Sequence, residues 1–160
     1  MAGMLSRRKK RRTAKTSGAM RLRFRLPVVK KVSLFEGLSG EELRQIAGLL
    51  NDLEVPAGTR LATAGEPGGE FFAIVKGEAG VTTRSGRTAV LRAGDFFGEM
   101  SLIDGQPRSA TVQANTPMRL LVLDQRDFRR LAGRTASIAL KIMQTLSRRL
   151  RVAEGDVVPE

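Results

Sequence analysis

The hydrophobic and polar positions of this sequence change their period along the chain. Between residues 40 and 50, apolar side chains recur at i, i+3, i+4 and i+7, which predicts an amphipathic helix. Ser39 and Glu42 precede this run with the spacing of a capping box, in which each side chain accepts a hydrogen bond from the other residue's backbone N–H. The helix is therefore expected to begin next to Ser39.

From 53 to 123 the pattern is typical of strands. Short runs rich in β-branched, aromatic and aliphatic residues alternate with Gly, Pro and polar breaks about every 8 to 12 residues. This spacing favours an antiparallel sandwich or barrel over βαβ units. The adjacent rings of Phe71-Phe72 and of Phe96-Phe97 are expected on opposite faces of a sheet, because successive strand residues alternate.

The C-terminal part of the chain returns to a helical period. Residues 124 to 133 predict a short helix that ends at Gly133, and a longer helix is expected from Ala136 to Val152. The apolar stripe of this longer helix is expected to comprise Ala139, Ile142, Met143, Leu146 and Leu150. The predicted fold class is mainly β with flanking helices.

The charge is concentrated at the N-terminus. The net charge is +12, and residues 1–31 contain twelve Lys or Arg and no acid, so the remaining 16 basic and 16 acidic residues balance. We interpret 1–31 as a basic, disordered tail that either stays solvated or binds nucleic acid or an anionic membrane surface through residues 7–31. The alternation over residues 21–28 gives one apolar face, which either adds a strand or lies against the folded domain.

Two absences in the composition narrow the function. The chain has no cysteine and no histidine, which excludes disulfides, a thiol nucleophile and the usual ligands of zinc or copper. A cupin-type metalloenzyme is set aside on this ground. A glycosidase pair of Glu99 with Asp95 or Asp104 has no other support. We expect no catalytic residue and no metal site, and the lack of a long apolar stretch predicts a soluble, cytoplasmic protein.

The most informative stretch is F-G-E-M-S-L-I-D-G-Q-P-R-S-A-T-V, residues 97–112. It places Glu99 and Arg108 nine residues apart in an otherwise apolar loop. One interpretation is a salt bridge at a turn. The other is a pocket in which Arg108 binds an anion bidentately while Glu99 accepts hydrogen bonds from hydroxyls. Gly98 would let the backbone approach the ligand, Ser109 would donate a hydroxyl, and the ligand would be a sugar that carries a phosphate.

These residues resemble the phosphate-binding cassette of cyclic nucleotide-binding domains, and the resemblance extends over about 32 to 153. It implies an antiparallel β jelly roll (a double-stranded β-helix) with an N-terminal helix, a short phosphate-binding helix and a long C-terminal helix. It also implies that Glu99 binds the ribose 2′-hydroxyl and that Arg108 binds the cyclic phosphate. The expected ligand-binding residues are Gly98, Glu99, Met100, Ser101, Arg108, Ser109 and Ala110.

The resemblance also sets the expected function. Serine at 109 favours cAMP over cGMP, and the chain ends at Glu160 without the helix-turn-helix DNA-binding domain of the bacterial cAMP-activated regulators. Ala153 and Glu154 replace the hydroxyl pair that those regulators offer to the adenine. We therefore expect a stand-alone, non-enzymatic sensor with cAMP as ligand and no other cofactor, a domain over 32–153 and a frayed end over 154–160.

Two partner predictions complete this interpretation. The C-terminal helix is expected to report occupancy by moving, and it offers a surface for a homodimer. The alternative function is binding of nucleic acid or an anionic surface through the basic tail, with the β-roll as a scaffold.

Overall fold

The computed structural model describes residues 18–155 of the chain. Eight strands form two four-stranded antiparallel sheets, with the orders β1-β8-β3-β6 and β2-β7-β4-β5. The strands are β1 (Asn51–Val55), β2 (Arg60–Ala62), β3 (Phe71–Lys76), β4 (Ala79–Thr83), β5 (Thr88–Leu91), β6 (Phe96–Phe97), β7 (Ala110–Ala114) and β8 (Met118–Leu123). The predicted mainly β roll is confirmed.

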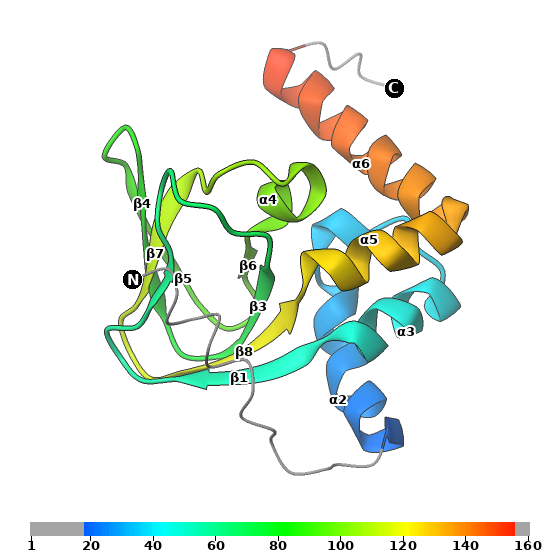
Figure 1. Ribbon diagram of the computed structural model, residues 1–160, viewed down its shortest axis with the longest axis horizontal. Coiled ribbons are helices and arrows are strands. Elements are labelled where there is room, and N and C mark those ends of the chain that lie inside the picture. The colour runs from blue at the N-terminus through cyan, green and yellow to red at the C-terminus, as the bar shows by residue number, and fades with distance from the viewer. Residues whose placement is uncertain (1–17, 156–160) are drawn as a thin grey trace.

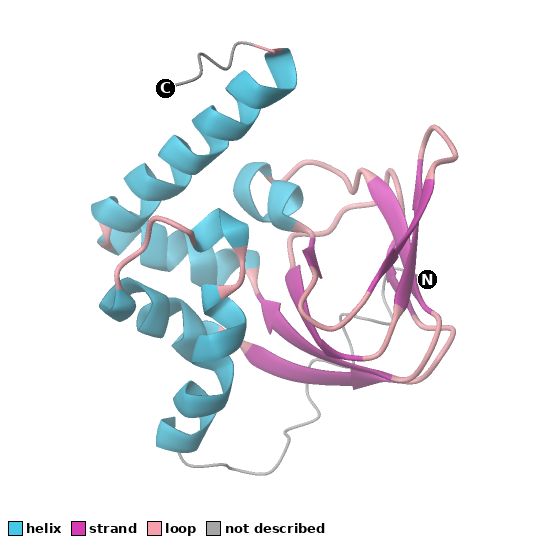
Figure 2. Cartoon of the chain, turned by 180° about the vertical axis from the view of Figure 1, so that it is seen from behind, coloured by secondary structure: helices cyan, strands magenta, loops and turns pink. Residues whose placement is uncertain are grey.

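The helices gather at one end of the roll, as both ribbon views show (Figures 1 and 2). They are α2 (Gly18–Lys30), the 3-10 helix η1 (Ser33–Phe35), α3 (Gly40–Leu49), α4 (Glu99–Asp104), α5 (Gln125–Arg134) and α6 (Ala136–Glu154). The capping box is present, since the Ser39 side chain accepts from the Glu42 backbone N–H and the Glu42 side chain accepts from that of Ser39. The helix predicted between 40 and 50 is α3.

The sheet with the order β1-β8-β3-β6 has an apolar core on each of its two faces. Phe71 and Phe72 point to opposite faces, so Phe71 lies in the core under the helices while Phe72 lies in the core between the sheets. Phe96 packs against the first core and Phe97 belongs to the second, as the alternation predicts. The sequences of β3 and β8 are nearly continuous apolar runs, because both faces of these strands are buried.

The prediction of a disordered tail over 1–31 is wrong for residues 18–31. Residues 18–30 form α2, and Val29 is buried in the core under the helices. Arg25 is also buried and donates to the Leu50 carbonyl and, at 3.0 Å, to Asp52 Oδ2. A carboxylate on β1 thus neutralises part of the charge run, and the helix adds to the core. Residues 1–17 lie outside the described part of the chain.

The C-terminal helices differ from their predictions in extent and in the face they bury. Gly133 lies inside α5, which ends at Arg134, and α6 continues through Glu154, which was expected to fray. The buried positions of α6 are Ile138, Ile142 and Thr145, while Met143 and Leu150 are 58% and 59% exposed. The cause is the packing partner, because α5 and η1 contact one side of α6 and its distal half extends away from the roll (Figure 1).

Candidate functional site

The motif over residues 97–112 contains a short helix, α4 (Glu99–Asp104). A glycine whose backbone is in the left-handed region lies at each end of this helix. Gly98, with φ of 89°, caps the N-terminus of α4, and Gly105, with φ of 68°, ends it. A Cβ at Gly98 would lie 2.5 Å from the Glu70 carbonyl oxygen and 2.9 Å from Arg108 Nη1. Glycine is therefore needed at 98 for both conformation and space, and it brings the α4 backbone close to the Arg108 guanidinium.

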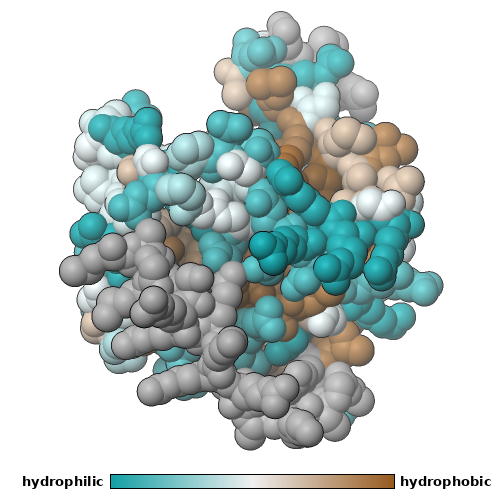
Figure 3. Space-filling view, in the orientation of Figure 1, coloured by the Kyte–Doolittle hydropathy of each residue, from teal (hydrophilic) through white to brown (hydrophobic). Residues whose placement is uncertain are grey.

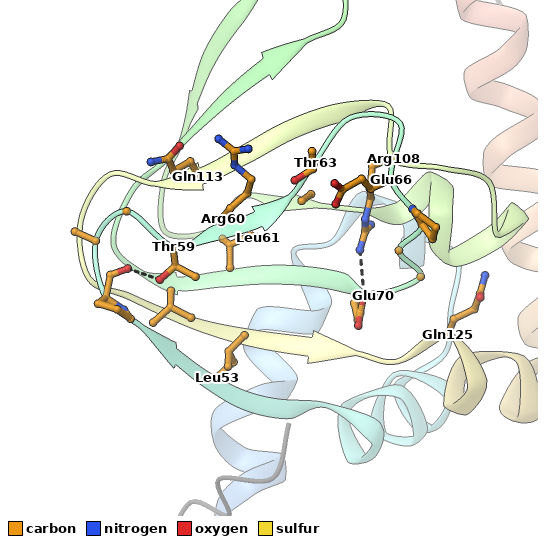
Figure 4. Close-up of a pocket in the computed structure, with 18 of the residues that line it drawn as sticks. Leu53, Thr59, Arg60, Leu61, Thr63, Glu66, Glu70, Arg108, Gln113 and Gln125 are labelled. Carbon is orange, nitrogen blue, oxygen red and sulfur yellow. Dashed lines mark hydrogen bonds and ion pairs between the residues drawn. The ribbon is translucent and has the colours of Figure 1, made fainter. Parts of the chain in front are cut away.

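Arg108 is the central charge of the site. Arg108 is only 5% exposed. Its Nη2 forms an ion pair with Glu70 Oε2 at 3.2 Å, which is drawn as a dashed line in Figure 4. Within the described residues, the buried Nη1 has no hydrogen-bond partner. Burial lowers the pKa of the Arg108 guanidinium below its usual value, and the nearby Glu70 carboxylate opposes that shift. A buried, unpaired N–H of a cation is costly, so this atom is poised for an anionic acceptor.

All seven residues predicted for ligand binding line one cavity of about 250 Å³. One side of this cavity is polar, with Glu99 on the first turn of α4 and Arg108 and Ser109 on the loop before β7. The remaining lining is apolar and comes from both sheets and the strand ends, namely Ala62, Val81, Ala89, Leu91, Phe96, Phe97 and Val112. The cavity thus combines a charged end with an apolar wall that suits a flat ring.

The salt bridge considered between Glu99 and Arg108 is not the one that forms. Arg108 pairs instead with Glu70, which lies 38 residues earlier in the chain, at the start of β3. The Glu99 carboxylate lines the same cavity as Arg108 without neutralising it. Sequence reasoning missed Glu70, and the signal available was a lone carboxylate directly before the apolar run of β3.

A second, larger cavity of about 1010 Å³ lies on the other side of Arg108. Leu53, Thr59, Arg60, Glu66 and Glu70 are among its lining residues (Figure 4). The orientation of the guanidinium distinguishes the two cavities. Nη2 pairs with Glu70, which lines the larger one, whereas Nη1 faces Gly98, which lines the smaller one. The unpaired donor therefore lies next to a residue that lines the smaller cavity.

We also searched the described part of the chain for a metal site and for a membrane-spanning helix. Residues 18–155 contain no group of three or more acidic, histidine or cysteine side chains arranged to hold a metal ion. No helix among these residues is both long enough and apolar enough to cross a bilayer.

Comparison with known proteins agrees with the geometry. The family model for the cyclic nucleotide-binding domain matches residues 52–135, which is just over half of the chain. A cyclic nucleotide-gated potassium channel of Mesorhizobium japonicum is 42% identical over 112 residues, which cover 70% of this chain and 31% of the channel. The match spans about a third of the length of such curated relatives.

Solved structures extend the likeness to the helices. The N-terminal domain of a transcriptional regulator from Streptomyces coelicolor has a TM-score of 0.71 at 26% identity, covering 83% of this chain and 96% of that domain. The regulatory domain of Toxoplasma gondii PKA, solved with cAMP, has a TM-score of 0.67 at 25% identity, covering 82% of this chain and 50% of that one.

Proposed function

Because this chain belongs to the cyclic nucleotide-binding domain family, we propose that it is a non-enzymatic sensor that binds a cyclic nucleotide, cAMP in preference to cGMP. The observation that carries this proposal is the buried Nη1 of Arg108, which has no partner in the described structure and lies beside Gly98, one of the motif residues that line the smaller cavity. A cyclic phosphate supplies the acceptor and the negative charge that this atom lacks.

Each end of the ligand has a counterpart in the cavity. Arg108 binds the cyclic phosphate, and Ser109 adds a hydroxyl donor beside it. The Glu99 carboxylate, on the first turn of α4, accepts a hydrogen bond from the ribose 2′-hydroxyl. The apolar lining then receives the base, and the two sheets that supply it exclude water from the ring. The solved PKA regulatory domain with cAMP supports this choice of ligand.

Within this proposal, α6 reports occupancy. Its proximal half is held by the buried side chains of Ile138 and Ile142. Leu140, Met143 and Leu150 lie exposed on another side, and apolar surface extends along this helix at the upper right of Figure 3. This stripe can pack over the occupied cavity or against a second copy of the chain. Ligand shifts the balance by its different affinity for the two arrangements.

Calorimetric titration tests the proposal. We expect the parent to bind cAMP more tightly than cGMP, and 5′-AMP weakly. Arg108→Ala should cost roughly 2–5 kcal/mol of binding free energy, because the phosphate loses a buried charged partner. Arg87→Ala, which removes an exposed arginine from the β4–β5 turn, is the matched control. A thermal melt of each variant separates lost binding from lost folding.

The ribose assignment has its own comparison. Glu99→Ala should weaken cAMP while leaving 2′-deoxy-cAMP unaffected, because the deoxy ligand lacks the hydroxyl. Equal losses for the two ligands would remove Glu99 from this role. A parent that binds no cyclic nucleotide, or a folded Arg108→Ala variant that binds cAMP like the parent, would overturn the proposed function.

A further inference from the structure

The side chain of Gln125 links α4, on which several cavity residues lie, to α5. Gln125 is the first residue of α5, and its Nε2 donates to the Ser101 carbonyl at 2.8 Å and to the Leu102 carbonyl at 3.3 Å. Both acceptors are carbonyl oxygens, so the amide must present its NH2 group to them. These carbonyls lie in the last turn of α4 (Glu99–Asp104), where the helix itself supplies no N–H donors to its carbonyl oxygens.

The surroundings of Gln125 are shaped to its side chain. A Cβ at Gly69 would lie 2.9 Å from Gln125 Cβ and 2.9 Å from Oε1, and one at Gly105 would lie 3.3 Å from Nε2. Two glycines from separate loops thus leave the space that the amide occupies. The Gly105 backbone N–H also donates to the Ser101 carbonyl at 2.9 Å, so that oxygen accepts from two donors.

The start of α5, where Gln125 lies, is fixed by contacts of its own. The preceding Asp124 side chain caps α5 by accepting from the Arg126 backbone N–H at 2.8 Å. Three residues after Gln125, Phe128 is buried in the same core as Ile138 and Ile142 of α6. The chain of contacts therefore runs from α4 through the Gln125 amide to α5, and from α5 to α6.

We propose that Gln125 is a positioning residue that fixes α4 against α5 and carries a change at the cavity to α6. The cavity residues Glu99 and Gly98 are at the N-terminal end of α4, and the Gln125 contacts are at its C-terminal end. Because α4 has only six residues, it moves as a rigid unit. A ligand that shifts the first turn of α4 towards the cavity therefore also displaces the Ser101 and Leu102 carbonyls. The ligand-bound half of this inference rests on the proposed function.

Two substitutions distinguish a donor from an acceptor at this position. Gln125→Glu keeps the shape but turns the donor into a carboxylate that repels both carbonyls. Gln125→Lys restores a donor, and its positive charge suits a helix C-terminus. Gln106→Glu introduces the same charge at an exposed position just after α4 and serves as the matched control.

Hydrogen exchange of the full chain without ligand is the first measurement. In Gln125→Glu, amides of 99–105 should exchange about tenfold faster than in the parent, because both hydrogen bonds that Gln125 Nε2 donates are lost. Gln125→Lys and Gln106→Glu should match the parent, and β4 and β5 should not change in any variant. Parent-like exchange over 99–105 in Gln125→Glu would overturn the inference without reference to any ligand.

The second measurement adds cAMP at saturation. We expect Gln125→Glu to keep cAMP affinity within about threefold of the parent, because Arg108 and Glu99 are untouched, yet to lose the ligand-induced change in exchange over 136–154. A retained change in α6 would refute the coupling. Affinity lost in parallel with the α6 response would show a merely structural role. A parent that binds no cAMP would count against the proposed function, whereas the ligand-free comparison would still decide whether Gln125 holds α4.

Discussion

Replacing Glu42 should test how the proximal half of α6 is held. The side chain of Glu42 is 9% exposed and accepts three hydrogen bonds: from the Ser39 backbone N–H at 2.8 Å, from Ser137 Oγ at 2.6 Å and from Lys141 Nζ at 2.5 Å. The last two donors belong to α6. These bonds, Lys141 first, lower the pKa of Glu42 from 4.5 to about 2.

The pKa shift sets the size of the expected effect. A fall from 4.5 to about 2 is about 2.5 units. At 1.36 kcal/mol per unit this corresponds to about 3 kcal/mol of folding stability from the ionised form. Because the pKa is lower in the folded state, this stability is present above pH 4.5 and is lost as the pH falls towards 2. Lys141 is partly exposed, so salt should screen part of it.

Glu42→Gln is the sharpest substitution, since it removes the charge and keeps the shape. We expect a loss of about 2–3 kcal/mol at pH 7, or a melting temperature lower by roughly 4–12 °C for a chain of this size. Urea denaturation at pH 7 and at pH 3 measures the loss, with the exposed neighbour Glu41→Gln as control. The loss should shrink at pH 3. An equal loss at both pH values, or one no larger than that of Glu41→Gln, would refute this reasoning.

Two further predictions concern other parts of the domain. Gly98→Ala should lower both the melting temperature and cAMP affinity, because its φ of 89° is strained for alanine and its Cβ would meet the Glu70 carbonyl. Gly133→Ala, which meets nothing within 4 Å, should be neutral or slightly stabilising. A chain of residues 32–160 should melt lower than one of residues 18–160, because it lacks α2 and the buried Val29. Equal melting of the two shortened chains would show that α2 does not stabilise the roll.

The sequence by itself determined the features that depend on neighbours a few residues away. The capping box of Ser39 and Glu42 needs a spacing of three, and the opposite faces of Phe71 and Phe72 follow from the period of a strand. The mainly β class was predicted for the same reason. Seven of the fourteen residues that line the smaller cavity were predicted as well, because they lie within one stretch, residues 97–112, whereas most of its apolar wall comes from strands elsewhere in the chain.

The tertiary structure decided what depends on partners far along the chain. The N-terminal charge run indicated disorder, yet Asp52 pairs with Arg25 and the apolar face of α2 has a core to enter. A salt bridge between Glu99 and Arg108 was one of the two interpretations of their spacing, but the structure pairs the guanidinium with Glu70 and leaves Nη1 without a partner among the described residues. Local pattern specifies conformation, whereas the partner of a buried charge is selected by which distant segment the packing brings within a few ångströms.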